Sequence, residues 1–242
     1  MMNSKNIVIV GGGSSLGKAL TDNINLSEHN VIIITSKEEF TSIHSNFSII
    51  HSSLKDEAEI KKISKKIFKI FDNIDILFFN NGGGLGIHDN FISFKLLKKL
   101  LWYNLGIIQT LINELLDKFN DNSRIICVGS VATKQITASI GYTIAKSSLE
   151  NYVRLLSKVL IPKNIHFICL SMGAFLVNNN AMDRLKKNKP DIYQRYINEK
   201  LPRKKMGNLL EIIPMINFLF FEEVGMFSGS IIPMDGGENN TL

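Results

Sequence analysis

The segment Ile7-Val-Ile-Val10-Gly-Gly-Gly-Ser-Ser-Leu-Gly17-Lys-Ala-Leu20 sets the fold that we expect for this chain. A β-branched apolar run, typical of a buried strand, leads directly into a glycine-rich turn, and a helical pattern follows. Glycines let the backbone approach a pyrophosphate, and free N–H groups at the helix start bind the anion. A glycine cluster alone is weak evidence, but its place between the first strand and the first helix strengthens it. We therefore expect a dinucleotide to bind the turn, which consists of Gly11, Gly12, Gly13, Ser14, Ser15, Leu16 and Gly17.

The same alternation of strand and helix continues along the chain. Short apolar runs predict strands at Asn6–Val10, Val31–Thr35, Phe47–His51, Ile74–Phe79, Arg124–Val128, Ile165–Leu170 and Gly229–Pro233. Helical patterns lie near residues 16–25, 56–71, 94–119, 142–160 and 207–221. This order predicts an α/β, Rossmann-type, doubly wound fold with a mostly parallel seven-stranded sheet and helices on both faces.

The chain is expected to form one domain over residues 1–242. Its composition, 45% hydrophobic and 21% charged, is that of a globular protein with a sizeable core. No linker or repeat divides it. One long polar stretch, Ala174–Lys205, is expected to be an irregular substrate loop, because long loops in compact domains are often functional.

The formal charge of +6 raises the possibility of a nucleic-acid partner. Many of the lysines, however, alternate with isoleucines along residues 60–70, which is typical of a solvated amphipathic helix. The longest apolar stretch, Leu209–Phe221, contains Glu211 and Pro214 and is too short to cross a bilayer. We expect no nucleic-acid or membrane partner.

The two cysteines, Cys127 and Cys169, lie inside apolar runs. Reduced, buried thiols are therefore expected, and two such residues make no zinc site, so we predict no metal. Ile7 begins a strand-like run rather than an export segment, and we expect a cytoplasmic protein.

The end of the second predicted strand selects between the two nicotinamide dinucleotides. An acidic residue there would accept hydrogen bonds from the ribose 2′-OH of NAD. This chain has Thr35-Ser36-Lys37 instead, and a hydroxyl with a cation suits the 2′-phosphate of NADP. Glu38 and Glu39 follow and could weaken the preference. We expect NADP(H) to be preferred over NAD(H), with Ser36 and Lys37 in contact with it.

Tyr142 and Lys146 are four residues apart on a predicted helix and so share one face. An ammonium group beside a phenol stabilises the phenolate, so the pair can give or take a proton. Ser130 follows the strand Arg124–Val128, at the edge where α/β sheets bind their ligands, and its hydroxyl can hold a substrate oxygen. The pattern predicts a proton-transfer site.

In these features the chain resembles the short single-domain branch of the short-chain dehydrogenase/reductase family, in particular members similar to 3-oxoacyl-carrier-protein reductases. The resemblance covers nearly the whole chain. It is carried by Gly11-x-x-x-x-x-Gly17, Asn80-Asn81-Gly82, Asn104-Leu105-Gly106, Ser130, Tyr142-x-x-x-Lys146 and Gly229-Ser-Ile-Ile-Pro-Met-Asp235-Gly236-Gly237.

The resemblance implies a role for each matched residue. Tyr142 would be the general acid or base, Lys146 would assist it and hold the nicotinamide ribose, and Ser130 would orient a carbonyl. Asn104 would hold a water that relays protons to Lys146. The remaining expected cofactor contacts are Ser53, Leu54, Asn80, Gly82, Gly173 and Phe175.

The chain departs from the family pattern at several positions. Ser15 replaces the middle glycine of the first turn, Ser53 replaces an aspartate beside the adenine, and Val177 replaces a threonine near the carboxamide. The Asn-Asn-Ala-Gly motif can be placed in two ways: counting from Asp75 or back from Asn104 puts its first asparagine on Phe79, with Asn80 second, whereas simple identity starts it at Asn80; we prefer the spacing. These departures bear on cofactor affinity rather than on proton transfer.

The expected activity is NADP(H)-dependent interconversion of a carbonyl and a secondary alcohol. The alternative is a catalytically weak or inactive regulator or scaffold that binds a dinucleotide. A sugar derivative and a 3-oxoacyl thioester both remain open as substrates. A homodimer or homotetramer is expected, with Leu97, Leu101, Leu105 and Ile108 as a possible apolar stripe.

Overall fold

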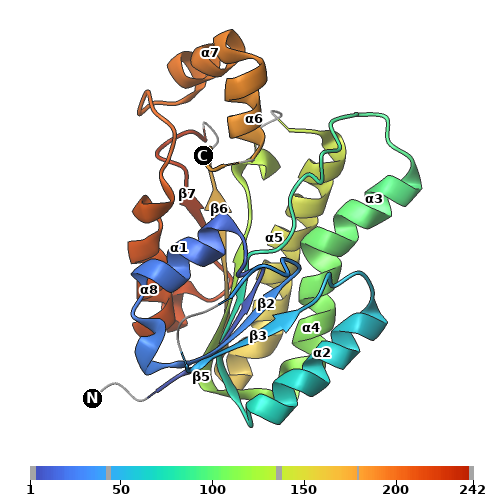
Figure 1. Ribbon diagram of the computed structural model, residues 1–242, viewed down its shortest axis with the longest axis vertical. Coiled ribbons are helices and arrows are strands. Elements are labelled where there is room, and N and C mark those ends of the chain that lie inside the picture. Colours follow the sequence, from blue (N-terminus) through green and yellow to red (C-terminus); the bar gives the residue numbers. More distant parts are fainter. Residues whose placement is uncertain (1–3, 42–44, 135–137, 179, 240–242) are drawn as a thin grey trace.

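The computed structural model describes residues 4–41, 45–134, 138–178 and 180–239. Within them, seven strands form one parallel sheet in the order β3-β2-β1-β4-β5-β6-β7 (Figure 1). The strands are β1 Asn6–Val10, β2 Asn30–Thr35, β3 Phe47–His51, β4 Ile74–Phe79, β5 Phe119–Val128, β6 Ile165–Met172 and β7 Ile231–Met234. The doubly wound sheet expected from the sequence is confirmed. From β1 the chain adds β2 and β3 on one side of the sheet, and it then returns to add β4 to β7 on the other side. The strand order therefore reverses between β1 and β4, and this switch point is where such folds bind ligands.

Helices cover both faces of this sheet (Figure 1). They are α1 Ser15–Asn23, α2 Glu57–Ile70, α3 Phe94–Leu101, α4 Ile107–Leu115, α5 Ile140–Leu160, α6 Ala181–Asn188, α7 Pro190–Lys200 and α8 Ile213–Phe221. Successive strand residues point to opposite faces. Val8 and Val10 accordingly pack with α2, α4 and α5, whereas Ile7 and Ile9 pack with α1 and α8. The uninterrupted apolar strand runs follow from this two-sided burial.

The helix expected over residues 94–119 is interrupted. A π-helical turn, Trp102–Gly106, joins α3 to α4, and a 3-10 turn ends at Lys118 before β5 begins at Phe119. A Cβ on Gly106 would lie 2.6 Å from the Trp102 ring, so the small residue admits the wider turn. The interruption sets Asn104 at a bend beside the end of β4, as π turns often do at functional sites.

Two further segments differ from the expectation. The stretch Ala174–Lys205 is not irregular, because it contains α6 and α7; Asn179 within it lies outside the described residues. Near the C-terminus, a 3-10 turn at Leu209–Glu211 precedes α8, which carries Pro214 in its first turn. No described helix is long and apolar enough to cross a membrane.

Candidate active site

The glycine-rich turn is held against the end of β2. The Gly11 N–H donates to the Ile34 carbonyl over 2.8 Å, and Gly11 has a φ of +80°, which favours glycine. A Cβ on Gly17 would lie 2.2 Å from the Gly12 carbonyl oxygen. Ser14 caps α1 by accepting from the Gly17 N–H over 3.2 Å. The turn is therefore packed too closely for side chains at these glycines, as a phosphate cradle requires.

Asn80 forms the opposite wall of this turn. Its side-chain amide donates to the Ser14 hydroxyl over 2.5 Å, and its own N–H donates to the Val10 carbonyl. A Cβ on Gly11 would lie 2.7 Å from the Asn80 carbonyl oxygen. Phe79, by contrast, ends β4 with its ring buried in the core. Phe79 therefore carries no polar group to this edge, and the amide side chains there begin at Asn80.

Asn81 and Asn104 line the next part of the edge. Asn104 is fully buried; its side-chain oxygen accepts from the Gly83 N–H, and its amide donates to the Gly83 and Leu100 carbonyls. Asn81 donates to the Tyr103 carbonyl over 2.8 Å, but its buried side-chain oxygen has no partner among the described residues. Asn104 therefore fixes the loop that starts at Gly82, and the water relay through it stays a prediction.

The predicted ribose contacts lie beside the turn. Thr35 is buried at the end of β2, and its hydroxyl accepts from the Lys37 N–H over 3.1 Å. Ser36 and Lys37 are exposed. A Cβ on Gly13 would lie 3.5 Å from the Lys37 Cβ, so the Lys37 side chain starts beside the cradle. A 2′-phosphate bound there would be within reach of a cation.

Ser53 and Leu54 are shaped by a carboxylate that the sequence analysis missed. Glu59 accepts hydrogen bonds from the Ser52 hydroxyl, the Lys55 N–H and the Ser53 N–H. Burial disfavours its charge, but these hydrogen bonds outweigh burial and hold the pKa of Glu59 below its ordinary value. Leu54 has a φ of +53°, and its carbonyl accepts from the Trp102 indole over 2.8 Å.

Lys146, on α5, reaches the end of β5, two residues before Ser130. Lys146 is 3% exposed, and its ammonium group donates to the Val128 carbonyl over 2.6 Å. Ser130, two residues further along, is buried and accepts from the Ala132 N–H. Tyr142 is half-buried one helical turn before Lys146. Residues 135–137, between Ser130 and α5, lie outside the described residues.

Glu150, one turn beyond Lys146, is a second buried carboxylate that the sequence analysis missed. It is 4% exposed and accepts at Oε1 from the Thr133 hydroxyl over 3.0 Å and the Ser171 hydroxyl over 3.3 Å. Burial raises its pKa, and the two hydrogen bonds oppose the rise only in part. Glu150 thus links α5 to the turn after Ser130 and to the end of β6.

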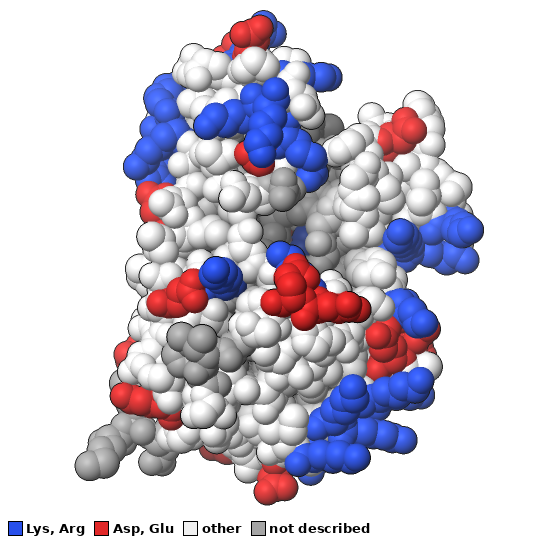
Figure 2. All heavy atoms as spheres, in the orientation of Figure 1, with Lys and Arg blue, Asp and Glu red and all other residues white. Residues whose placement is uncertain are grey.

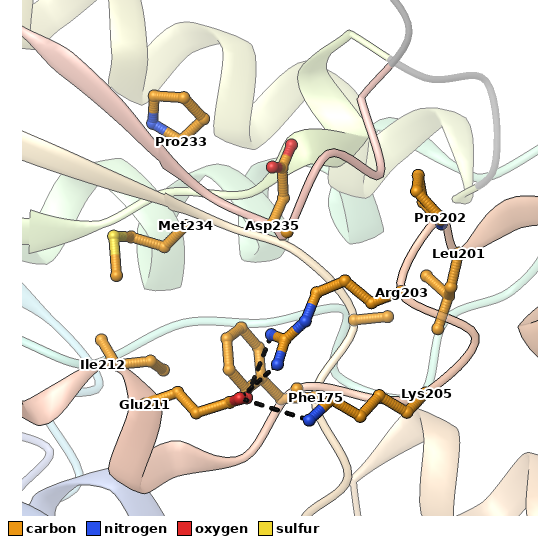
Figure 3. A pocket seen from close by; sticks show the side chains of 13 residues that line it. Phe175, Leu201, Pro202, Arg203, Lys205, Glu211, Ile212, Pro233, Met234 and Asp235 are labelled. Carbon is orange, nitrogen blue, oxygen red and sulfur yellow. Dashed lines mark hydrogen bonds and ion pairs between the residues drawn. The ribbon is translucent and has the colours of Figure 1, made fainter.

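Gly173 and Phe175 follow β6 but face different surroundings. A Cβ on Gly173 would lie 2.7 Å from Asp235 and from the Glu238 carboxylate. The Phe175 ring packs against Gly207 and lines a cavity of about 200 Å³, across which Arg203 and Lys205 point toward Glu211 (Figure 3). These ion pairs and the Asn208 N–H lower the pKa of Glu211 to about 2, with the Arg203 hydrogen bond as the largest cause.

The arrangement fits a nicotinamide dinucleotide. The close-packed glycine turn follows β1, and Lys37 follows β2, its neighbour in the sheet. Asn81 follows β4 on the other side of β1, and its buried side-chain oxygen has no partner among the described residues. Figure 2 shows a hollow between α6 and α7 on one side and the part of the molecule that carries α3 on the other. The expected site residues therefore border one edge of the sheet, except that the Phe175 side chain turns to the separate cavity.

Comparison with known proteins agrees with this geometry. A family model described as Enoyl-(Acyl carrier protein) reductase matches residues 11–239. The 3-oxoacyl-[acyl-carrier-protein] reductases of Buchnera aphidicola and Aquifex aeolicus are 25% and 24% identical, each over 95% of both chains.

Solved structures share the fold. Pseudomonas aeruginosa RhlG in its NADP complex aligns with a TM-score of 0.85 at 21% identity, covering 98% of this chain and 97% of RhlG. A short-chain dehydrogenase from Leptospira borgpetersenii with bound NAD+ aligns with a TM-score of 0.83 at 21% identity, covering 98% of this chain and 94% of that one.

Proposed function

The chain belongs to the short-chain dehydrogenase/reductase family and is an oxidoreductase, and we propose that it interconverts a carbonyl and a secondary alcohol with NADP(H). The observation that carries the proposal is the buried Lys146. Within the described residues no acidic side chain forms an ion pair with it, although a buried ammonium is costly without compensation. Such a cation at a ligand-binding sheet edge favours a functional role.

The chemical roles that we propose are those that the family resemblance implies for the matched positions. Tyr142, one turn from Lys146, gives a proton to the carbonyl oxygen in reduction and takes it back in oxidation. Lys146, whose ammonium group donates to the Val128 carbonyl, would stabilise the phenolate and hold the nicotinamide ribose, and Ser130 would donate to the substrate oxygen. Asn104 keeps the neighbouring loop in place. A bound NADP(H) supplies or accepts the hydride.

The cofactor is proposed to lie along the glycine-rich turn, with its 2′-phosphate at Ser36 and Lys37. The support is the exposed Lys37, whose Cβ would lie 3.5 Å from a Cβ on Gly13, together with the absence of an acidic side chain at positions 35–37. Ser53 and Leu54 would flank the adenine, and the Gly173 backbone would face the carboxamide. RhlG, which shares the fold, has been solved as an NADP complex.

A 3-oxoacyl thioester is the substrate class that we propose, in preference to a sugar derivative. The names of the two bacterial relatives support it. Basic residues on and after α6 and α7 suit a substrate with phosphate or acidic groups; they include Lys186, Lys187, Lys189, Lys204 and Lys205. The family model's description names an enoyl reductase, so a 2-enoyl thioester should be assayed beside the 3-oxoacyl thioester.

Tyr142→Phe tests the proton-transfer role. We expect turnover of a 3-oxoacyl thioester to fall at least ~100-fold, the scale of general acid catalysis, while NADPH binding followed by fluorescence stays unchanged. Tyr152→Phe is the matched control, because Tyr152 lies further along α5 and packs edge-on against Phe167. Wild-type turnover in Tyr142→Phe would refute the assigned mechanism. Binding of NADPH by a wild type that turns over no carbonyl substrate would favour the dinucleotide-binding regulator or scaffold.

We also propose that the chain forms a homodimer or homotetramer through α5. Ile144, Leu155 and Val159 expose 42%, 66% and 64% of their surface along this helix. The stripe expected from Leu97 to Ile108 is less suitable, because Ile108 is buried in the core. Association through α5 would cover these apolar side chains.

A further inference from the structure

Glu238, next to the C-terminal end of the described chain, is a buried carboxylate that joins three segments. It is 3% exposed. Its Oε2 accepts from the Ala174 N–H over 2.7 Å, and its Oε1 accepts from the Tyr196 hydroxyl. Ala174 follows β6, and Tyr196 lies on α7. The end of the sheet, the α6–α7 helices and the C-terminal tail therefore meet at one side chain.

The tail is folded so that this carboxylate points inward. Asp235 accepts from the Gly237 N–H over 2.9 Å and from the Asn239 N–H over 3.1 Å. Gly236 and Gly237 have φ values of +61° and +83°, which glycine adopts without strain. A Cβ on Gly173 would lie 2.7 Å from Glu238 Oε2, so the carboxylate lies directly on the backbone there.

The α6–α7 unit, residues 181–200, packs largely through an apolar cluster of its own. Its apolar cluster of Tyr193, Ile197 and Leu201 is separate from the two clusters on the faces of the sheet. The chain enters and leaves the unit through a short parallel pairing, in which the Gly207 N–H donates to the Ala174 carbonyl over 2.9 Å. The hydroxyl of Tyr196 adds a contact from the middle of α7 to the sheet end.

The chemistry of this contact is that of a strong hydrogen bond. Hydrogen bonds from a phenol to a carboxylate group are shorter and about twice as strong as bonds between two neutral groups when the carboxylate carries its charge. Burial, and then the bond to Glu238, raises the pKa of Tyr196, so the hydroxyl keeps its proton in the pH range of ordinary assays. The contact therefore holds α7 in one position under assay conditions.

We propose that Glu238, acting through Tyr196, is a positioning residue that fixes the α6–α7 unit against the end of β6 and thereby sets the affinity for the substrate. The inference rests on the proposed function, in which the segment after Gly173 binds the substrate. It goes beyond that function because neither residue touches the reacting atoms. The hydrogen bonds that Glu238 accepts from Ala174 and Tyr196 hold the α6–α7 unit beside Gly173, at the end of β6. β6 pairs with β5, whose end carries Ser130 and receives Lys146.

Tyr196→Phe removes only the hydroxyl and is the first test. We expect the KM for a 3-oxoacyl thioester to rise about 10-fold, the scale of losing a hydrogen bond to a charged group. The kcat and the affinity for NADPH should stay within about two-fold of the wild-type values. Glu238→Gln should give a similar rise, and the double variant no further rise, because both changes remove the same contact. A purely structural role would lower the unfolding temperature and leave KM unchanged.

Limited trypsin digestion supplies a readout that needs no turnover. Lysines at 186, 187, 189 and 200 lie on or between α6 and α7, so cleavage there reports how often the unit opens. We expect Tyr196→Phe to be cut there about 10-fold faster than the wild type. Tyr193→Phe, on the same helix but in its apolar cluster, should be cut at the wild-type rate.

The two proposals fail in different ways. If the wild type turns over no carbonyl substrate, the proposed function fails, while faster digestion of Tyr196→Phe still supports the contact. If Tyr196→Phe keeps the wild-type KM in an enzyme that turns over its substrate, the role in substrate affinity is refuted, whatever the digestion rate; an unchanged digestion rate refutes the contact's hold on α6–α7. Should Glu238→Gln fail to fold, Tyr196→Phe alone decides the matter.

Discussion

Replacing Gly17 by alanine sets two physical effects against each other. Gly17 lies in α1 with an ordinary helical backbone, where alanine is favoured over glycine by about 1 kcal/mol. Against this, the new Cβ would lie 2.2 Å from the Gly12 carbonyl oxygen and 2.5 Å from its carbon, whereas ordinary contact begins at 3.4 Å. The turn would have to move by about 1 Å, and overpacking of this kind costs about 1–3 kcal/mol.

The net loss of stability is therefore small, about 0–2 kcal/mol, which lowers Tm by about 0–8 °C in a domain of this size. The effect on the cofactor should be larger, because a displacement of about 1 Å in a positioning element can cost about 100-fold. We expect the Tm of Gly17→Ala, measured by circular dichroism, to lie about 0–8 °C below that of the wild type. We expect its affinity for NADPH, measured by fluorescence titration, to be at least ~10-fold weaker.

Gly84→Ala is the matched control. A Cβ at Gly84 would meet nothing within 4 Å, and its φ is not positive. We expect its stability to stay within about 0.5 kcal/mol of the wild type and its NADPH affinity to be unchanged. Wild-type affinity for NADPH in Gly17→Ala would refute the view that contact between α1 and Gly12 shapes the cofactor site.

Three further variants test the cation, a buried carboxylate and the exposed face of α5. Lys37→Ala should raise the Kd for NADPH about 10-fold and change that for NADH far less; equal effects on both would place the 2′-phosphate elsewhere. Burial raises the pKa of Glu150 in the folded chain above its unfolded value of 4.5. As the pH rises from 4.5 through the raised pKa of the folded chain, Glu150 must ionise in a buried place, so the wild type loses stability relative to Glu150→Gln. Melting curves from pH 4 to pH 8 should show the Tm of the wild type falling relative to that of Glu150→Gln and the difference then becoming constant; a difference in Tm that stays the same from pH 4 to pH 8 would contradict this. Leu155→Glu, at a side chain 66% exposed, should turn a wild-type dimer or tetramer into monomers in light scattering, and a wild type already monomeric at micromolar concentration would exclude the proposed interface.

Carboxylates were the part of the candidate site that sequence reasoning missed. Glu59, Glu150 and Glu238 each gain their roles from partners on other elements, and Ala174 and Glu238 are 64 residues apart. Nothing in the local pattern marks them, because glutamate on a helix or near a terminus is usually solvated. The α6–α7 unit was missed for a related reason, since its sparse apolar residues pack mainly on one another.

What the sequence determined by itself is local. The order of strands and helices, the glycine-rich turn at Gly11–Gly17 and the shared face of Tyr142 and Lys146 all follow from periodicities over a few residues. Only the tertiary structure decided that Lys146 lies buried against Val128, that a π turn sets Asn104 beside Gly83, and that Glu238 reaches Tyr196. These contacts depend on how the helices pack over the sheet, because burial and long-range hydrogen bonds exist only once distant segments meet.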